Sequence, residues 1–413
     1  MDVDALLAGT RWDFESFPQY LDMLERQKPQ ANVAVLAQHS TIRNAVMGED
    51  ASTVAAPTSA QLAEMRALVA EAMDAGAAGF ASSFSPNHSG WGGRPMPSTI
   101  ASDEELRSLV SVLGAKGRGI FVMATGPRAT PEFMESLAAD TGRPAFIVTV
   151  LTMYNRAQPE RALEMYERCA QAKARGHEVY IHANCQPLSF DFTLREPYLL
   201  YSHDAFDRVK AAAPEARGAI YREQGFRDRL RYNFLHPKQG ILFYGDWSQV
   251  ERDGVAVTEL VAKLYQNDDA GVAPLLKHPA GLIALSDAGA HLIYFCDAGY
   301  GLHFLAHWVR DTETFTLEEG VRRLTSDPAR KYRIPKRGLI APGYHADLLL
   351  FEPRRVGVSK LRRVNDLPGG GARMLRDPEG VRGVWVNGVE VFDGMCYTAL
   401  DSGPGGVLRR FER

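Results

Sequence analysis

Short apolar runs rich in β-branched residues alternate with longer segments of helical spacing over the first 350 residues of the chain. Six runs have the length and composition of strands: 32–39 (NVAVLAQH), 79–84, 119–125, 144–151, 178–184 and 281–287 (GLIALSD). Several of them have no polar face, which is typical of strands buried on both sides in a parallel sheet. The pattern therefore predicts βα units around one parallel sheet, the α/β class.

The segments between these runs carry helix signals. Residues 58–76 form a long amphipathic stretch that ends at Gly76, and residues 130–142 begin with Thr-Pro and end at Gly142. Ser102 and Glu105 have the spacing of a capping box, in which each side chain bonds the backbone N–H of the other. Each of these predicted helices precedes a predicted strand, as βα units require.

Two parts of the chain depart from the alternation. Residues 186–280, between the fifth and sixth runs, are rich in aromatic and charged residues and too long for a connection, so we predict a lid or specificity region there. From residue 337 the pattern changes to short strands with Gly and Asn turns. We therefore predict a barrel domain over residues 1–336 and a small β domain over residues 337–413.

Composition narrows the class of partner. The 413 residues include 47 basic and 50 acidic side chains, a net charge of −3 without a basic stripe, which argues against nucleic acid. The four cysteines form no CxxC pair, which argues against a zinc ribbon or a disulfide framework and favours a reducing cytoplasm. The first residues lack a signal-peptide pattern, and no later stretch is apolar enough for a membrane span.

Three ionisable residues fall at the ends of predicted strands, where parallel α/β barrels place their catalytic groups: His39, His182 and Asp287. Imidazoles and a carboxylate that converge on one barrel mouth could form a zinc site that activates water for hydrolysis. Alternatively, the two histidines are hydrogen-bonded structural residues, and Asp287 is the N-cap of a helix. The residues themselves leave these alternatives open.

Further candidates for substrate contact lie in loops. His291 follows the last predicted strand, where it could touch a substrate or lie at the surface. His88 and Arg94 lie among glycines that would let the backbone approach a ligand closely. The planar fork of Arg94 matches two carboxylate oxygens, although a plain surface loop is the alternative. We assign substrate binding to His88, Arg94, His182 and His291.

Three stretches, residues 76–106, 285–291 (LSDAGAH) and 324–353 (LTSDPARKYRIPKRGLIAPGYHADLLLFEP), resemble the amidohydrolase superfamily and within it the D-aminoacylase group. The resemblance implies a (β/α)8 barrel of the TIM type with a β-sandwich built from both chain ends. It also implies zinc in the barrel mouth and hydrolysis of a non-peptide C–N bond, the amide of an N-acyl-D-amino acid. Asp287 matches the family aspartate that binds metal and transfers a proton.

The chain departs from the family pattern in two respects. It contains no His-x-His, the motif that ends the first barrel strand in the family. Its six runs correspond to the third to eighth strands of the family barrel. The barrel of this chain is therefore expected to lack the first two strands. The runs 119–125 and 144–151 also lack the histidines expected at their ends. Asp287 and either His39 or His182 remain as metal ligands, of which we assign Asp287 and His39, fewer than the three of a catalytic zinc site. The open apolar edges need a cover, which either the long insertion or a second copy of the chain in a homo-oligomer could provide.

Taken with the composition, the resemblance predicts a cytoplasmic, metal-dependent deacylase of a small molecule such as an N-acyl amino acid. It predicts no nucleic-acid or membrane partner. The alternative from another class is a catalytically inactive remnant that binds a ligand or a partner chain through the open barrel edge. The missing His-x-His motivates this alternative.

Overall fold

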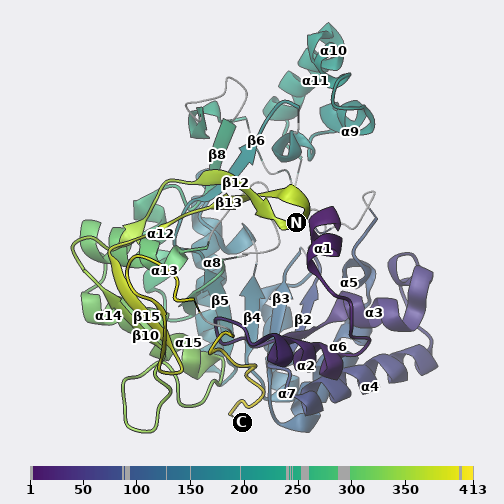
Figure 1. Ribbon diagram of the computed structural model, residues 1–413. Coiled ribbons are helices and arrows are strands. Elements are labelled where there is room, and N and C mark those ends of the chain that lie inside the picture. The colour runs from purple at the N-terminus through teal and green to yellow at the C-terminus, as the bar shows by residue number, and fades with distance from the viewer. Residues whose placement is uncertain are drawn as a thin grey trace.

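The computed structural model describes residues 3–85, 88, 94–126, 128–148, 150–195, 197–238, 241, 243, 245–252, 260–286, 298–399 and 402–412. Its centre is a parallel sheet of six strands (Figure 1). In spatial order these are β1 (Leu36–Gln38), β2 (Gly79–Ser83), β3 (Ile120–Ala124), β4 (Ala145–Val148), β5 (Val179–Ala183) and β9 (Gly281–Ile283). Each strand lies within one of the six predicted runs, so the predicted α/β class with a parallel sheet is confirmed.

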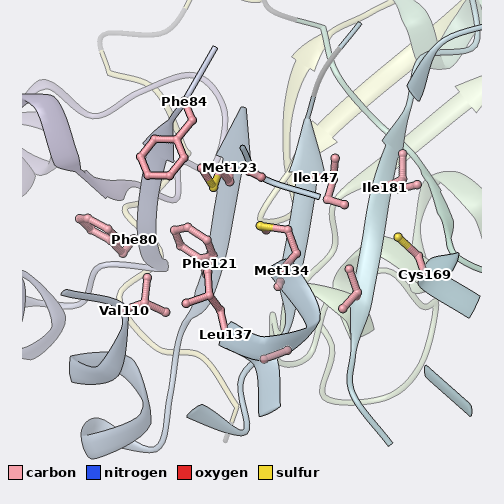
Figure 2. Close-up of a cluster of buried hydrophobic side chains, with 14 of the residues drawn as sticks. Phe80, Phe84, Val110, Phe121, Met123, Met134, Leu137, Ile147, Cys169 and Ile181 are labelled. Atoms are coloured by element: carbon pink, nitrogen blue, oxygen red, sulfur yellow. The ribbon is translucent and has the colours of Figure 1, made fainter. Parts of the chain in front are cut away.

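The helices that connect the strands pack as one layer on one face of the sheet. They are α3 (His39–Met47), α4 (Ser59–Ala75), α6 (Asp103–Lys116), α7 (Pro131–Thr141), α8 (Pro159–Ala174) and α12 (Asp269–Lys277), whose buried apolar residues share one cluster with that face. The short helix α5 (Pro97–Ile100) precedes α6 in the chain. Phe80, Phe121, Ile147 and Ile181 point from four neighbouring strands into this layer and are fully buried (Figure 2). Helices on a single face are typical of a barrel wall, whereas a doubly wound sheet has helices on both faces.

The opposite face of the sheet, which we call the inner face, carries a second and smaller hydrophobic cluster. It contains Ile120, Phe146, Tyr180 and Leu282, which alternate along their strands with the residues of the helix-covered face. After α14 (Leu317–Leu324) and α15 (Ser326–Lys331), Tyr332 packs against this cluster. Lys331 donates from Nζ to the Gly281 carbonyl at 2.9 Å and so attaches α15 to β9.

Most helix ends follow the sequence signals. Thr58 and Gln61 form a capping box at the start of α4, and Gly76 ends that helix with a φ of 108°. At α6 the prediction is only half right, because Ser102 accepts from the Glu105 backbone but the Glu105 side chain does not return to Ser102. It points into the core and bonds Arg43, since a buried arginine without a counter-charge would be costly.

The segment between β5 and α12 forms its own small assembly, which Figure 1 shows projecting beyond the sheet. Its elements are β6 (Leu188–Phe192), β7 (Val250–Arg252), β8 (Leu260–Tyr265), α9 (Asp207–Ala211), α10 (Arg217–Arg222) and α11 (Gln224–Leu235). Phe190, Phe206 and Phe243 centre a separate hydrophobic cluster there. The Gln266 side chain donates to the Asn184 carbonyl and joins the two ends of the segment. A separate cluster thus occupies much of the predicted insertion, whereas α12 packs with the main core.

The C-terminal part consists of short antiparallel strands. One sheet contains β10 (Leu348–Phe351), β15 (Val381–Val386) and β16 (Val389–Phe392). Two further sheets have two strands each. One pairs β12 (Arg362–Leu367) with β13 (Gly371–Leu375), and the other pairs β11 (Gly357–Val358) with β14 (Pro378–Glu379). Asn387 and Gly388 join β15 to β16 with φ values of 50° and 85°. Positive φ at both positions is the signature of the tight hairpin turn that Asn-Gly favours.

The two chain ends meet in space. Helices α1 (Val3–Gly9) and α2 (Phe17–Gln27) precede the sheet, and the tail after β16 returns to this region (Figure 1). Leu408 donates its backbone N–H to the Val33 carbonyl at 2.7 Å, and Arg409 contacts Asp22 and Glu25 of α2. Among the described residues, no helix combines the length and the apolar character that crossing a membrane requires.

Candidate functional site

The carboxyl ends of β1, β2, β3, β4, β5 and β9 lie along one edge of the parallel sheet, where an α/β barrel builds its active site. Of the residues assigned from sequence, His39 follows β1, His182 lies in β5, and His88 is held at the end of β2. Asp287 and His291 lie outside the described residues.

His39 begins α3 directly after β1 and is buried. Its Nδ1 lies 2.8 Å from the Ser82 hydroxyl, and its Nε2 lies 2.9 Å from Glu105 Oε1. Arg43, one turn further along α3, donates from Nε to the same Glu105 oxygen at 3.0 Å. Burial lowers the pKa of His39, although the hydrogen bond with Glu105 opposes the shift. His39 is thus part of a buried polar network.

This network changes the interpretation of His39. Both ring nitrogens already have partners, so a metal ion at His39 would have to displace Ser82 or Glu105. Displacing Glu105 would also leave the buried guanidinium of Arg43 without its counter-charge, which is unfavourable. The geometry therefore disfavours the predicted metal role and favours the alternative from the sequence, a hydrogen-bonded structural histidine.

His182 lies on the inner face of β5 and is half-buried. Its Nε2 is 2.7 Å from the hydroxyl of Tyr332, and its ring packs near Phe146 at a centroid distance of 5.6 Å. Burial, with a smaller effect from the Lys331 ammonium, lowers the pKa of His182 to about 4. The imidazole is therefore neutral near pH 7, and it lies on the inner face of the sheet.

The depressed pKa of His182 predicts an acid-sensitive fold. The pKa of His182 is about 4 in the folded chain and roughly 6.5 in the unfolded chain. Below about pH 6.5 the unfolded chain therefore binds a proton at His182 more readily than the folded chain does. The free energy of unfolding falls for this reason as the pH drops from 6.5 toward 4. Between about pH 7 and pH 5 we expect His182 to account for a loss of about 2 kcal/mol in the free energy of unfolding.

Urea unfolding at these two pH values measures the loss, and a His182→Gln variant is the control. Glutamine does not titrate, so the variant should lose less free energy of unfolding between the two pH values than the wild-type chain. An equal loss in both proteins would show that His182 does not titrate as described.

His88 and Arg94 are both exposed. His88 Nδ1 lies 2.6 Å from the hydroxyl of Ser83, the last residue of β2, so its ring is held near the edge where the strands end. Arg94 lies three residues ahead of α5 with its side chain open to solvent. Both side chains are accessible, as substrate contact requires, and their binding roles stay predictions.

An unusual backbone conformation follows β9, two positions before Asp287 in the sequence. Leu285 has a φ of 80°, in the left-handed region that a leucine rarely adopts. Such backbone strain persists only where the surrounding structure imposes it, and it gathers at active sites and ligand clamps. The strained residue lies two positions before the acid assigned from sequence.

Two residues near this region were missed by sequence reasoning. Tyr332 reaches His182 across 150 positions of sequence, and only its place in the family-like stretch 324–353 singled it out. Gln186 follows β5, is buried, and its Nε2 has no hydrogen-bond partner among the described residues. A glutamine carries no local pattern that would have indicated a site.

A cavity of about 450 Å³ lies elsewhere, along the free edge of β1. Phe17, Leu36, Ile42 and Leu68 are among its lining residues, which are mainly apolar. Among the described residues, neither Arg94 nor any of the histidines lines it, so we do not regard it as the active site. It lies at the edge that the sequence predicted to be open, and the cover of this edge by the insertion or a second copy remains a prediction.

The described residues contain no group of three or more His, Cys, Asp or Glu side chains arranged to hold a metal ion. A catalytic zinc site normally has three protein ligands. Asp287, His291 and Cys296 lie outside the described ranges.

Comparison with known proteins gives a consistent result. The model of the amidohydrolase family matches residues 235–392. An N-acyl-D-aspartate deacylase of Alcaligenes xylosoxydans xylosoxydans is 25% identical, over 92% of this chain and 69% of its own length. A D-aminoacylase of the same organism is 26% identical, over 97% of this chain and 75% of its own.

Among solved structures, the chain is similar to an N-acyl-D-glutamate deacylase from Bordetella bronchiseptica complexed with zinc and a phosphonate inhibitor. The TM-score is 0.66 at 24% identity, over 98% of this chain and 77% of that chain. This likeness supports the α/β fold described above. Together the matches confirm the resemblance to the D-aminoacylase group that the sequence predicted.

Proposed function

We propose that this chain, an amidohydrolase of the D-aminoacylase group, removes the acyl group from an N-acyl-D-amino acid. Its enzyme class, a hydrolase of C–N bonds other than peptide bonds, follows from the family. The substrate class and the activity of this particular chain are the proposal.

The proposed substrate class rests on the relatives that match nearly the whole chain. Relatives named for deacylation of D-aspartate and D-glutamate derivatives, together with a D-aminoacylase, each match more than nine-tenths of this chain. The matched region therefore includes the strands and strand ends rather than one peripheral motif. In support, the strained Leu285 lies two positions before the predicted acid, Asp287, in the sequence.

We further propose that the six-stranded sheet is the wall of a TIM-type (β/α)8 barrel that lacks its first two strands in this chain. The helix layer on one face and the sequential order of the strands support this arrangement. The substrate would then approach the inner face near the strand ends, where His182 lies.

In the proposed reaction, the oxygen of a water molecule forms a bond to the amide carbon, and the C–N bond breaks. Asp287 takes a proton from the attacking water and passes it to the leaving nitrogen. Arg94 is suited to hold the substrate carboxylate, because its guanidinium can donate two parallel hydrogen bonds. The products are a carboxylic acid and a free D-amino acid.

Zinc is part of the expected chemistry, because a relative of this group binds it and the metal lowers the pKa of bound water. The donor set in the described residues does not fit a catalytic zinc site, since no three-ligand group is present there and His39 is engaged. Any zinc ligands would therefore include residues outside the described ranges, Asp287 first among them.

The direct test is an assay of purified protein against N-acetyl-D-aspartate, N-acetyl-D-glutamate and N-acetyl-D-leucine, with the L enantiomers as matched controls. Release of the free amino acid is measured with and without added zinc. We expect hydrolysis of at least one D substrate and a preference over its L enantiomer. A folded protein that releases no amino acid in any condition would favour the alternative, a remnant that binds a ligand or a partner.

A further inference from the structure

His182 and Tyr332 form a pair that the family resemblance does not explain. His182 lies on the inner face of β5, and Tyr332 comes from the segment after α15, 150 positions later. The Tyr332 ring stacks on Phe146 at a centroid distance of 4.9 Å and an interplanar angle of 29°. Phe146 also lies 5.6 Å from the His182 ring. Three aromatic side chains are therefore packed together, and the hydroxyl and the imidazole have little freedom to separate.

The proton in this pair belongs to the tyrosine. Burial raises the pKa of Tyr332, so the phenol stays protonated, and His182 is neutral near pH 7. A neutral imidazole has one N–H and one acceptor nitrogen. If Nε2 carried the proton, the Tyr332 O–H would have no acceptor among the described residues. We therefore infer that Tyr332 donates to Nε2 and that the ring proton of His182 is on Nδ1.

The Nδ1–H group has no acceptor among the described residues. A half-buried donor held in a fixed orientation, without a protein partner, is suited to bind a group that arrives from outside. The inner face around it is apolar, formed by Phe146, Leu282 and Ala284, so a hydrogen bond there would be stronger than one in water. The chemistry that complements such a donor is a carbonyl oxygen that gains negative charge.

We propose that His182 donates Nδ1–H to the carbonyl oxygen of the substrate amide, and that Tyr332 is the positioning residue that holds His182 in this tautomer. The inference rests on the proposed function and assigns one more group to that reaction. His182 keeps its proton throughout, because it stabilises the oxyanion while the proton of water passes through Asp287 to the leaving nitrogen. A neutral donor of this kind acts on developing charge without changing its own protonation state.

The test is Tyr332→Phe, which removes one hydroxyl and keeps the ring that stacks on Phe146. Without the O–H donor, we expect the Nε2–H tautomer of His182 to appear in the ¹⁵N NMR spectrum of the imidazole. We expect kcat for the N-acyl-D-amino acid to fall roughly 10- to 100-fold, with a much smaller change in KM, because the lost interaction belongs to the transition state.

Tyr180→Phe is the matched control. Tyr180 lies on the same inner face, but its hydroxyl donates to Glu178 at 2.8 Å rather than to His182. This variant should retain both the Nδ1–H tautomer and kcat.

Two results would overturn the inference. If Tyr332→Phe keeps the wild-type tautomer, Tyr332 does not position the proton. If the tautomer changes and kcat does not, the Nδ1–H group does not act on the substrate. The tautomer is measured on the protein alone, so a chain without deacylase activity would refute the proposed function while the spectrum still decides the role of Tyr332.

Discussion

Replacing Asp287 with asparagine is expected to reduce kcat for N-acyl-D-amino acid hydrolysis by roughly 10²- to 10⁴-fold, the range for loss of a general base. Asparagine has nearly the same shape as aspartate but cannot accept a proton from water or deliver one to the leaving nitrogen. Release of free amino acid at saturating substrate measures the effect. Because the substituted group acts in the chemical step, kcat should fall far more than the affinity for substrate.

The control for this substitution is Asp140→Asn. Asp140 lies on α7 and makes a surface ion pair with Arg107 at 3.0 Å, a type of contact that contributes little. This variant should keep both kcat and stability. An Asp287→Asn enzyme with activity close to that of Asp140→Asn would refute the assignment of Asp287 as the proton-transfer group.

Glu105→Ala should be the most destabilising of the substitutions considered, by about 3 to 5 kcal/mol, the range for breaking a buried ion pair. Glu105 is 1% exposed and its Oε1 accepts from both Arg43 and His39. Removing the carboxylate leaves the Arg43 guanidinium buried without a counter-charge. Urea unfolding followed by circular dichroism gives the free energy of unfolding for comparison with the wild-type chain.

Glu104→Ala provides the comparison within the same helical turn. Glu104 is exposed in the first turn of α6, where its only expected contribution is a favourable interaction with the helix dipole, a few tenths of a kcal/mol. A Glu105→Ala variant no less stable than Glu104→Ala would mean that the His39–Glu105–Arg43 network does not stabilise the fold.

The parallel sheet could be predicted because its signal is local. A run such as 119–125 is almost entirely apolar, and the helix after it is capped by Thr130 and Gly142, both as the sequence indicates. The signal for the Asn387-Gly388 turn is local as well, because a turn with two successive positive φ values favours asparagine and glycine at these positions. These elements need no knowledge of distant contacts.

The site could be predicted only in part, because a sequence gives the strand to which a residue belongs but not its distant partners. His39 and His182 looked alike at strand ends. The first is held by Glu105, 66 positions away, and the second by Tyr332, 150 positions away. Glu105 had a plausible local role as a capping residue, which concealed its burial. Long-range pairing of this kind leaves no periodic trace in the sequence.

The hydrogen bond between Gln266 and Asn184 has a consequence for how this enzyme could diversify. It ties the entry and exit of the 188–265 segment together beside β5, so the two ends of the segment leave the sheet close to one another. The entropy of closing a loop grows only with the logarithm of its length, so once its ends are fixed the segment can be lengthened, shortened or exchanged at small thermodynamic cost. If the proposed function holds, the substrate range could thus change through this segment while the six strands of the sheet stay unchanged.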